Sequence, residues 1–78
     1  MSNKEKILAR FASHLTRLRQ DRGLSIRQLA AASGLEYSQV QRIEKAKVNL
    51  AFTTLVALAQ GLEMDLGELL LEYKIPRS

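Results

Sequence analysis

The sequence contains no cysteine and no tryptophan, and only one proline and one histidine among its 78 residues. Without cysteine the chain cannot form disulfides or thiolate metal sites, and a single histidine cannot build a histidine-rich metal site. The N-terminal segment MSNKEKILARF has no long apolar run, so it predicts neither a signal peptide nor a membrane span. We therefore expect no metal, no cofactor, no membrane partner and a cytoplasmic location.

The residues that are present favour a small helical domain. Leucine and alanine are prominent within a hydrophobic fraction of 46%, and both residues favour helices. The length predicts one domain over residues 1–78, with a modest core and no room for a deep substrate cleft beside it. No nucleophile–base pair and no phosphate-binding glycine loop appears, so we do not expect an enzyme. The formal charge of +4 suits a polyanionic partner, but the positions of the charges must decide.

Apolar spacing and capping signals predict an all-α chain of five helices. We expect these helices at residues 4–22, 26–33, 37–45, 51–60 and 65–73. Three of them begin with a capping-box pair, in which an N-cap side chain precedes Glu or Gln by three residues. The pairs are Ser2 with Glu5, Ser25 with Gln28, and Asp65 with Glu68. Gly23 and Gly61 are expected to end helices, and Gly34 to supply the positive φ of a sharp turn.

The apolar residues of these helices recur at helical spacing. The first helix has an apolar stripe of Ile7, Phe11, Leu15 and Leu18. The fourth is expected to bury Phe52, Leu55 and Leu58, and the fifth has a stripe of Leu66, Leu69, Leu70 and Tyr73. His14 is expected on the polar face of the first helix, without a chemical role.

Residues 26–45 meet the requirements of a helix-turn-helix. Ala30 is small where two helices must cross closely, and Gly34 permits a turn that a Cβ atom would obstruct. The apolar seam that would fix the crossing consists of Leu29, Leu35, Val40 and Ile43. Because these six positions agree in one register, we favour this motif over the alternative of an ordinary helical hairpin. The second helix of the motif has a thin apolar seam and a broad polar face, which suggests that it contacts a partner.

Three segments together resemble the Cro/repressor, or XRE-type, helix-turn-helix family. They are LRQDRGLSIRQLA, GLEYSQVQRIEKAK and NLAFTTLVALAQGLEMDLGELL, within residues 11–70. The resemblance implies a compact, lambda-repressor-like domain of five helices, whose third helix enters the major groove of double-stranded DNA. The chain departs from the family pattern at four positions. Ile26 replaces a phosphate-binding Gln, Glu36 replaces a Ser or Thr cap, Ala46 replaces Gly, and Leu50 replaces Pro.

The resemblance also implies which residues contact DNA bases. The family's base-reading positions fall on Tyr37, Ser38, Gln41 and Arg42. Arg42 can bind guanine with a bidentate fork, and Gln41 can pair with adenine. Tyr37 can pack on a thymine methyl or bond a phosphate. The alternative for each is a solvated surface residue.

Further positions are expected to hold DNA phosphates or to support the reading helix. Expected phosphate contacts are Lys45, Lys47, Asn49, Arg27 and Gln28, with Arg17 and Arg22 as weaker candidates. Solvated charges are the alternative for the basic residues, and a cap of the fourth helix is the alternative for Asn49. In the family an arginine late in the first helix pairs with a glutamate late in the third, so Arg19 and Glu44 are expected to form a structural ion pair.

The function implied by the resemblance is sequence-specific transcription regulation. We expect a homodimer on a near-palindromic operator, with no small-molecule ligand implied, as in restriction–modification controllers, Cro-type repressors or other autoregulators. The dimer is expected to form through the C-terminal helix, with Val56, Leu66, Leu70, Leu71, Tyr73 and Ile75 at the interface. The alternative is that the leucines of the last helix cap the monomer's own core. The alternative function is a protein-interaction module, including an antitoxin-type one, with weak or no DNA binding.

Overall fold

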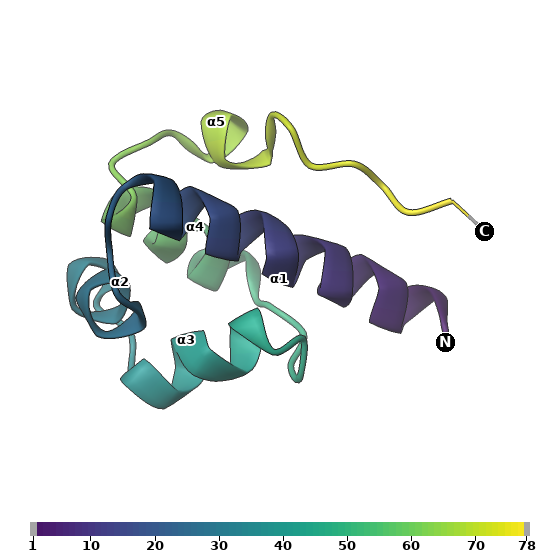
Figure 1. Cartoon of the computed structure of the whole chain (residues 1–78), viewed down its shortest axis with the longest axis horizontal. Coiled ribbons are helices and arrows are strands. Elements are labelled where there is room, and N and C mark those ends of the chain that lie inside the picture. The colour runs from purple at the N-terminus through teal and green to yellow at the C-terminus, as the bar shows by residue number, and fades with distance from the viewer. Residues whose placement is uncertain (1, 78) are drawn as a thin grey trace.

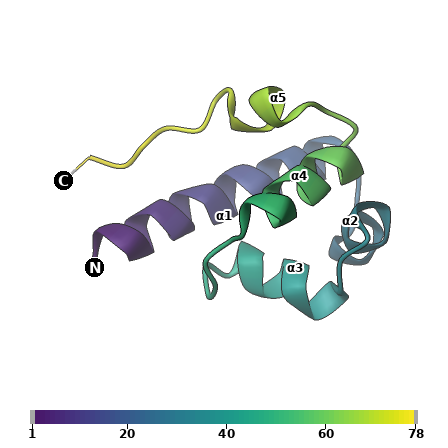
Figure 2. The ribbon, with the colours of Figure 1, turned by 180° about the vertical axis from the view of Figure 1, so that it is seen from behind.

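The computed structural model describes residues 2–77, and these form five α-helices with no strand (Figure 1). The helices are α1 (Asn3–Asp21), α2 (Ile26–Ser33), α3 (Tyr37–Glu44), α4 (Phe52–Gly61) and α5 (Leu66–Leu70). The long α1 crosses the molecule, with α3 on one side and α5 with the C-terminal segment on the other (Figures 1 and 2). The all-α fold predicted from the sequence is confirmed.

The predicted helix boundaries are correct where a local capping signal sets them. Ser2 with Glu5, and Ser25 with Gln28, form reciprocal capping boxes that begin α1 and α2. At α5 the backbone N–H of Asp65 donates to Glu68 Oε1 at 2.8 Å. The chain leaves α1 and α2 through two glycines in the left-handed region, where a Cβ atom would be strained. These are Gly23, with φ 67°, and Gly34, with φ 69°.

The prediction that Gly61 ends α4 is confirmed, since Gly61 is the last residue of that helix. Gly61 does not supply a left-handed turn, because the residue with a left-handed φ, 57°, is Glu63. Gly61 is instead buried where α4 crosses α2, and a Cβ atom there would collide with Ser33 Oγ. Glycine is needed at this position because the two helices approach so closely.

The core lies where α1, α2, α3 and α4 meet, and α5 contributes Leu69 to it. Its fully buried side chains are Leu15, Leu29, Val40, Leu58, Leu62 and Leu69. The predicted helix-turn-helix seam is present, since Ile43 and Ala30 are also buried and Leu35 packs against the cluster. Phe52 is an exception to the prediction, because its side chain is 66% exposed. It occupies the first position of α4, one turn before the buried stripe begins, and so lies at the rim.

The fifth helix is shorter than predicted, because it ends at Leu70 and not at residue 73. After Leu70 the chain turns and runs back along α1 (Figures 1 and 2). Tyr73 holds this segment: its hydroxyl donates to the carbonyl of Ile7 at 3.1 Å, and its ring lies 6.3 Å from that of Phe11. Tyr73 and Leu66 therefore pack against the monomer's own core.

The expectation that His14 lies on a polar face is also wrong, since only 7% of this residue is exposed. Its Nε2 lies 2.6 Å from the carbonyl oxygen of Leu69. A carbonyl only accepts, so Nε2 carries the hydrogen and Nδ1 is left to accept from Arg17 Nη2 at 3.3 Å. His14 thus joins α1 to α5. Within residues 2–77, none of the helices combines the length and apolar character that crossing a bilayer requires.

Candidate nucleic-acid interface

The helix α3 is held in place by a buried ion pair with α1. Arg19 Nε donates to Glu44 Oε2 at 2.7 Å, and Arg19 Nη2 donates to Glu44 Oε1 at 2.9 Å. The two side chains are 12% and 7% exposed, so the pair is largely shielded from water. Thr16 adds a hydrogen bond to the same carboxylate. The hydrogen bonds that Arg19 donates to Glu44 raise the pKa of Arg19 above its usual value, so Arg19 stays charged.

With its buried residues facing α1 and α2, α3 turns its remaining side chains outward. Val40 and Ile43 are buried, whereas Ser38 and Arg42 are exposed. Tyr37 and Gln41, one turn apart, are half-buried. The structure therefore brings the four predicted base-reading residues together on α3.

An interaction that the sequence did not reveal lies at the start of α3. The guanidinium of Arg27 stacks over the ring of Tyr37, with 4.3 Å between the guanidinium carbon and the ring centroid. In such a cation–π contact the positive charge of the guanidinium is attracted to the face of the aromatic ring. Because Arg27 lies in the first turn of α2 and Tyr37 begins α3, the contact connects a predicted phosphate-binding residue with a predicted base-reading residue. Helical spacing cannot reveal it, since the turn between the two helices sets the distance.

The segment after α3 carries the other predicted phosphate contacts. Lys45, Lys47 and Asn49 are all exposed. Between the lysines, Ala46 adopts a left-handed φ of 58°. The predicted alternative for Asn49 as a helix cap is wrong, because the N-cap of α4 is Ala51. Gln28 uses its Oε1 in the capping box of α2, which leaves its amide N–H groups able to donate.

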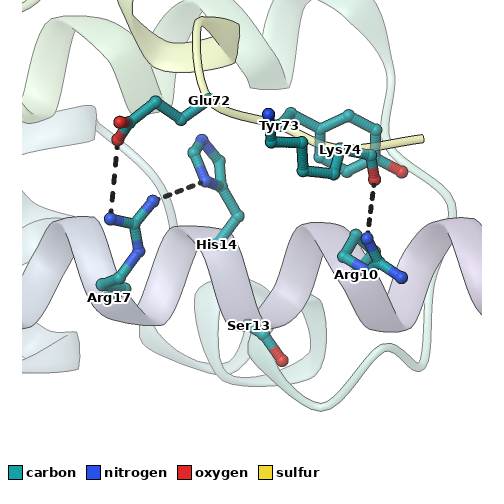
Figure 3. A pocket seen from close by; sticks show the side chains of 7 residues that line it. All are labelled: Arg10, Ser13, His14, Arg17, Glu72, Tyr73 and Lys74. Atoms are coloured by element: carbon teal, nitrogen blue, oxygen red, sulfur yellow. Dashed lines mark hydrogen bonds and ion pairs between the residues drawn. The ribbon is translucent and has the colours of Figure 1, made fainter. Parts of the chain in front are cut away.

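Three other positions do not join this surface. Ile26 packs against the core, so its side chain cannot replace the glutamine that binds phosphate in the related family. Arg22 Nε donates to the carbonyl of Leu62 just beyond α4. Arg17 contacts His14 near the C-terminal segment (Figure 3). That segment lies on the side of α1 away from α3 (Figure 1).

A surface of this kind, on a five-helix frame, is matched by a known family. The model of the Cro/C1-type helix-turn-helix DNA-binding domain matches residues 14–73. The chain belongs to this family. Its members are DNA-binding transcription regulators and not a class of enzymes, and the family's partner is double-stranded DNA. The resemblance noted from the sequence is confirmed.

Individual proteins are also similar to the chain. The HTH-type transcriptional regulator PuuR of Escherichia coli is 39% identical over 62 residues, which are 80% of this chain and 34% of PuuR. The chain thus spans about a third of that relative. The restriction-modification controller protein C.AhdI from Aeromonas hydrophila is 35% identical, with a TM-score of 0.76, over 80% of this chain and 94% of that one. An HTH_3 family regulator from Vibrio cholerae is 26% identical, with a TM-score of 0.80, over 87% and 38% of the two chains.

Proposed function

We propose that this Cro/C1-type chain is a sequence-specific transcription regulator that binds a near-palindromic operator as a homodimer. The observation that carries the proposal is the outward face of α3, where Ser38 and Arg42 are exposed beside Tyr37 and Gln41. Within residues 2–77, no ion pair engages Arg42. Its bidentate fork is therefore available for a guanine edge, which is the commonest specific contact in the major groove.

The charges around α3 support the same proposal. Arg27 from α2 and Lys45 and Lys47 from the following segment flank the reading face, and all three are exposed. Side chains of this kind bind phosphates and set the register of a protein on the duplex without reading its sequence. The buried Arg19–Glu44 pair supports the reading face from behind, because it fixes the direction in which α3 projects.

The homodimer is supported by apolar residues that the monomer leaves uncovered. Leu71, Ile75 and Phe52 are 79%, 74% and 66% exposed, and Leu70 is partly exposed. Exposed apolar groups that cluster usually mark an interface. We propose an interface formed by Leu70, Leu71, Ile75 and Val56 with Phe52 added, while Leu66 and Tyr73 serve the monomer's core. A two-fold dimer on DNA would place the two α3 helices about 34–36 Å apart, one helical turn.

A role as a restriction–modification controller is supported by the similarity to C.AhdI, which extends over 94% of that protein. Selection of bound sequences from a random duplex pool tests the proposal most directly. We expect a consensus with two half-sites related by two-fold symmetry. A consensus without such symmetry would refute the dimeric operator geometry.

Sedimentation velocity tests the interface independently of DNA. At micromolar concentration we expect a dimer, and Leu71→Asp should convert it to a folded monomer because a charge cannot be buried unpaired in an apolar contact. Glu72→Gln, at the neighbouring exposed position, should leave the dimer intact. A monomeric parent protein would contradict the proposed interface.

A second candidate function, an interaction module on the same fold, is favoured by two departures from the family pattern. Ile26 packs inward, and Glu36, the N-cap of α3, is exposed and makes no capping hydrogen bond with its side chain. Titration with random duplex at two salt concentrations separates the two functions. DNA binding should weaken steeply with salt, since phosphate contacts release counterions. Absence of binding at low salt would favour the interaction module.

A further inference from the structure

A hollow of about 250 Å³ lies between α1 and the C-terminal segment (Figure 3). It is on the side of α1 away from α3 (Figure 1). The residues that line it include Arg10, His14 and Arg17 from α1, and Glu72, Tyr73 and Lys74 from the segment after α5. It is separate from the reading face, and neither the base-reading residues nor the proposed dimer residues line it.

The hollow has more positive than negative charge. Three of its side chains are cationic, namely Arg10, Arg17 and Lys74, and one is a carboxylate, Glu72. The ion pair between Arg17 Nη1 and Glu72 Oε1 is long, at 3.6 Å, and the two side chains are 51% and 69% exposed. Exposed pairs of this kind are weak, so an incoming anion can displace Glu72 from Arg17.

Neither arginine has its hydrogen-bonding capacity filled. Arg10 Nη1 donates to the carbonyl of Lys74 at 3.2 Å. Arg17 Nη2 donates to His14 Nδ1, whose ring is oriented by its bond to the Leu69 carbonyl. A guanidinium has five N–H donors, so each arginine keeps donors for a ligand. The contact with His14 Nδ1 orients the Arg17 guanidinium and, unlike a carboxylate, brings no negative charge to it.

The spacing of the arginines defines the class of ligand. Arg10 and Arg17 are seven residues apart on α1, which corresponds to about 10 Å along the helix axis. Both side chains extend toward the C-terminal segment (Figure 3). Guanidinium forks match the geometry of carboxylate and phosphate oxygens. At that spacing a short molecule with an acidic group at each end can place one group on each guanidinium.

We infer that this hollow binds a small molecule carrying two acidic groups, carboxylate or phosphate. One group takes the place of Glu72 at Arg17, and the other lies at Arg10 and Lys74. Such a ligand joins α1 to residues 72–74, directly between Leu71 and Ile75. Because Leu71 and Ile75 are proposed dimer residues, the bound ligand would also affect dimer formation. That effect rests on the proposed function, whereas the binding of the ligand does not. The sequence implied no small-molecule ligand because the two sides of this hollow are about 60 residues apart in the chain.

Calorimetric titration of the full chain at low salt, without DNA, tests the inference. The probes are glutarate and pyrophosphate as two-group anions, and propionate and inorganic phosphate as their one-group counterparts. We expect at least one two-group probe to bind at least tenfold more tightly than its counterpart. Arg10→Gln and Arg17→Gln should each weaken that binding at least tenfold. Lys4→Gln, which removes the same charge elsewhere on α1, should change it less than twofold.

Removal of the competing carboxylate, Glu72, should strengthen ligand binding, whereas the arginine substitutions should weaken it. Glu72→Gln should tighten binding of the two-group probe several-fold, whereas Glu63→Gln, which removes a carboxylate after α4, should not. Backbone amide shifts in NMR spectra should move first at residues 72–74. The inference is overturned if no probe binds at 50 mM, if one-group and two-group anions bind equally, or if Lys4→Gln weakens binding as much as Arg17→Gln. Since DNA is absent, none of these results depends on whether the chain binds an operator.

Discussion

The helix α3 and the C-terminal segment both dock on α1, but through different kinds of contact. For α3 the contact joins two side chains, Arg19 and Glu44, in a buried bidentate pair. For α5 and the C-terminal segment the hydrogen bonds join a side chain to a backbone carbonyl, and the Arg17–Glu72 ion pair is long and exposed. His14 bonds the carbonyl of Leu69, Tyr73 that of Ile7, and Arg10 that of Lys74.

This difference shows how rigidity is distributed in the molecule. A buried charged pair has a single good geometry, so α3 is fixed in direction as a reading helix requires. A carbonyl acceptor is present at every residue, so a slipped segment can find a replacement bond. The C-terminal segment, which carries the proposed dimer residues and one side of the hollow, is thus the part better able to adjust to a partner.

The largest expected effect is on the α3 side. Glu44→Ala should lower the free energy of unfolding by about 3–5 kcal/mol, because it leaves Arg19 buried without its partner. Urea melts of Glu44→Ala, Arg19→Ala and the double variant measure the effect. The double variant should lose much less than the sum of the single losses. Small and additive losses would contradict the view that this pair locks α3.

Arg42→Ala tests the exposed face of the same helix. It should cost about 1–3 kcal/mol of binding free energy on the selected operator and relax preference at one base pair. Its stability should be nearly unchanged, because Arg42 is exposed. Lys47→Ala is the matched variant and should weaken all sequences about equally. If Arg42→Ala leaves the consensus and affinity unchanged, the register of α3 in the groove is different from the one proposed.

Gly61→Ala tests the close crossing of α4 on α2. The added Cβ would meet Ser33 Oγ, Cβ and backbone N, so the helices must separate, at a cost of about 1–3 kcal/mol. Gly67→Ala is the control, since it lies in α5 with no other atom within 4 Å of the added Cβ. That variant should be about 0.5–1 kcal/mol more stable in thermal or urea melts. Equal effects of the two variants would show that the crossing tolerates a larger separation.

His14→Phe tests the C-terminal side. It keeps a ring of similar size but removes the donor to the Leu69 carbonyl, which should cost about 1–2 kcal/mol of unfolding free energy. His14→Gln, whose amide can still donate, should lose less. Hydrogen exchange should show the added opening at α5 and not at α3. An equal loss of hydrogen-exchange protection at α3 and at α5 would contradict the view that the two elements dock on α1 independently.

The smallest expected effect is at Ala46, after α3. Its left-handed φ of 58° is strained for any residue with a Cβ. Ala46→Gly should relieve this strain, and after the greater freedom of the unfolded chain is subtracted it should stabilise the protein by about 0.5–1 kcal/mol. Ala32→Gly, at an exposed helical position of α2, should destabilise it by a similar amount. Thermal melts of the two variants should therefore shift in opposite directions.

The sequence by itself determined the features that depend on neighbouring residues. The capping pairs set the starts of α1 and α2, Gly34 set the turn of the helix-turn-helix, and helical spacing identified its buried seam. These signals are local, since each hydrogen bond or φ angle involves residues a few positions apart. They were enough to recognise the family and to choose the outward residues of α3.

Only the tertiary structure decided where one segment meets another. It buried His14 against Leu69, ended α5 early so that Tyr73 reaches Ile7, and exposed Phe52 at the rim of the core. It also stacked Arg27 on Tyr37 and enclosed the cationic hollow. Helical periodicity shows which residues share a face, but not how far the neighbouring segment extends over that face. That extent depends on the packing of the whole chain, so no local pattern contains it.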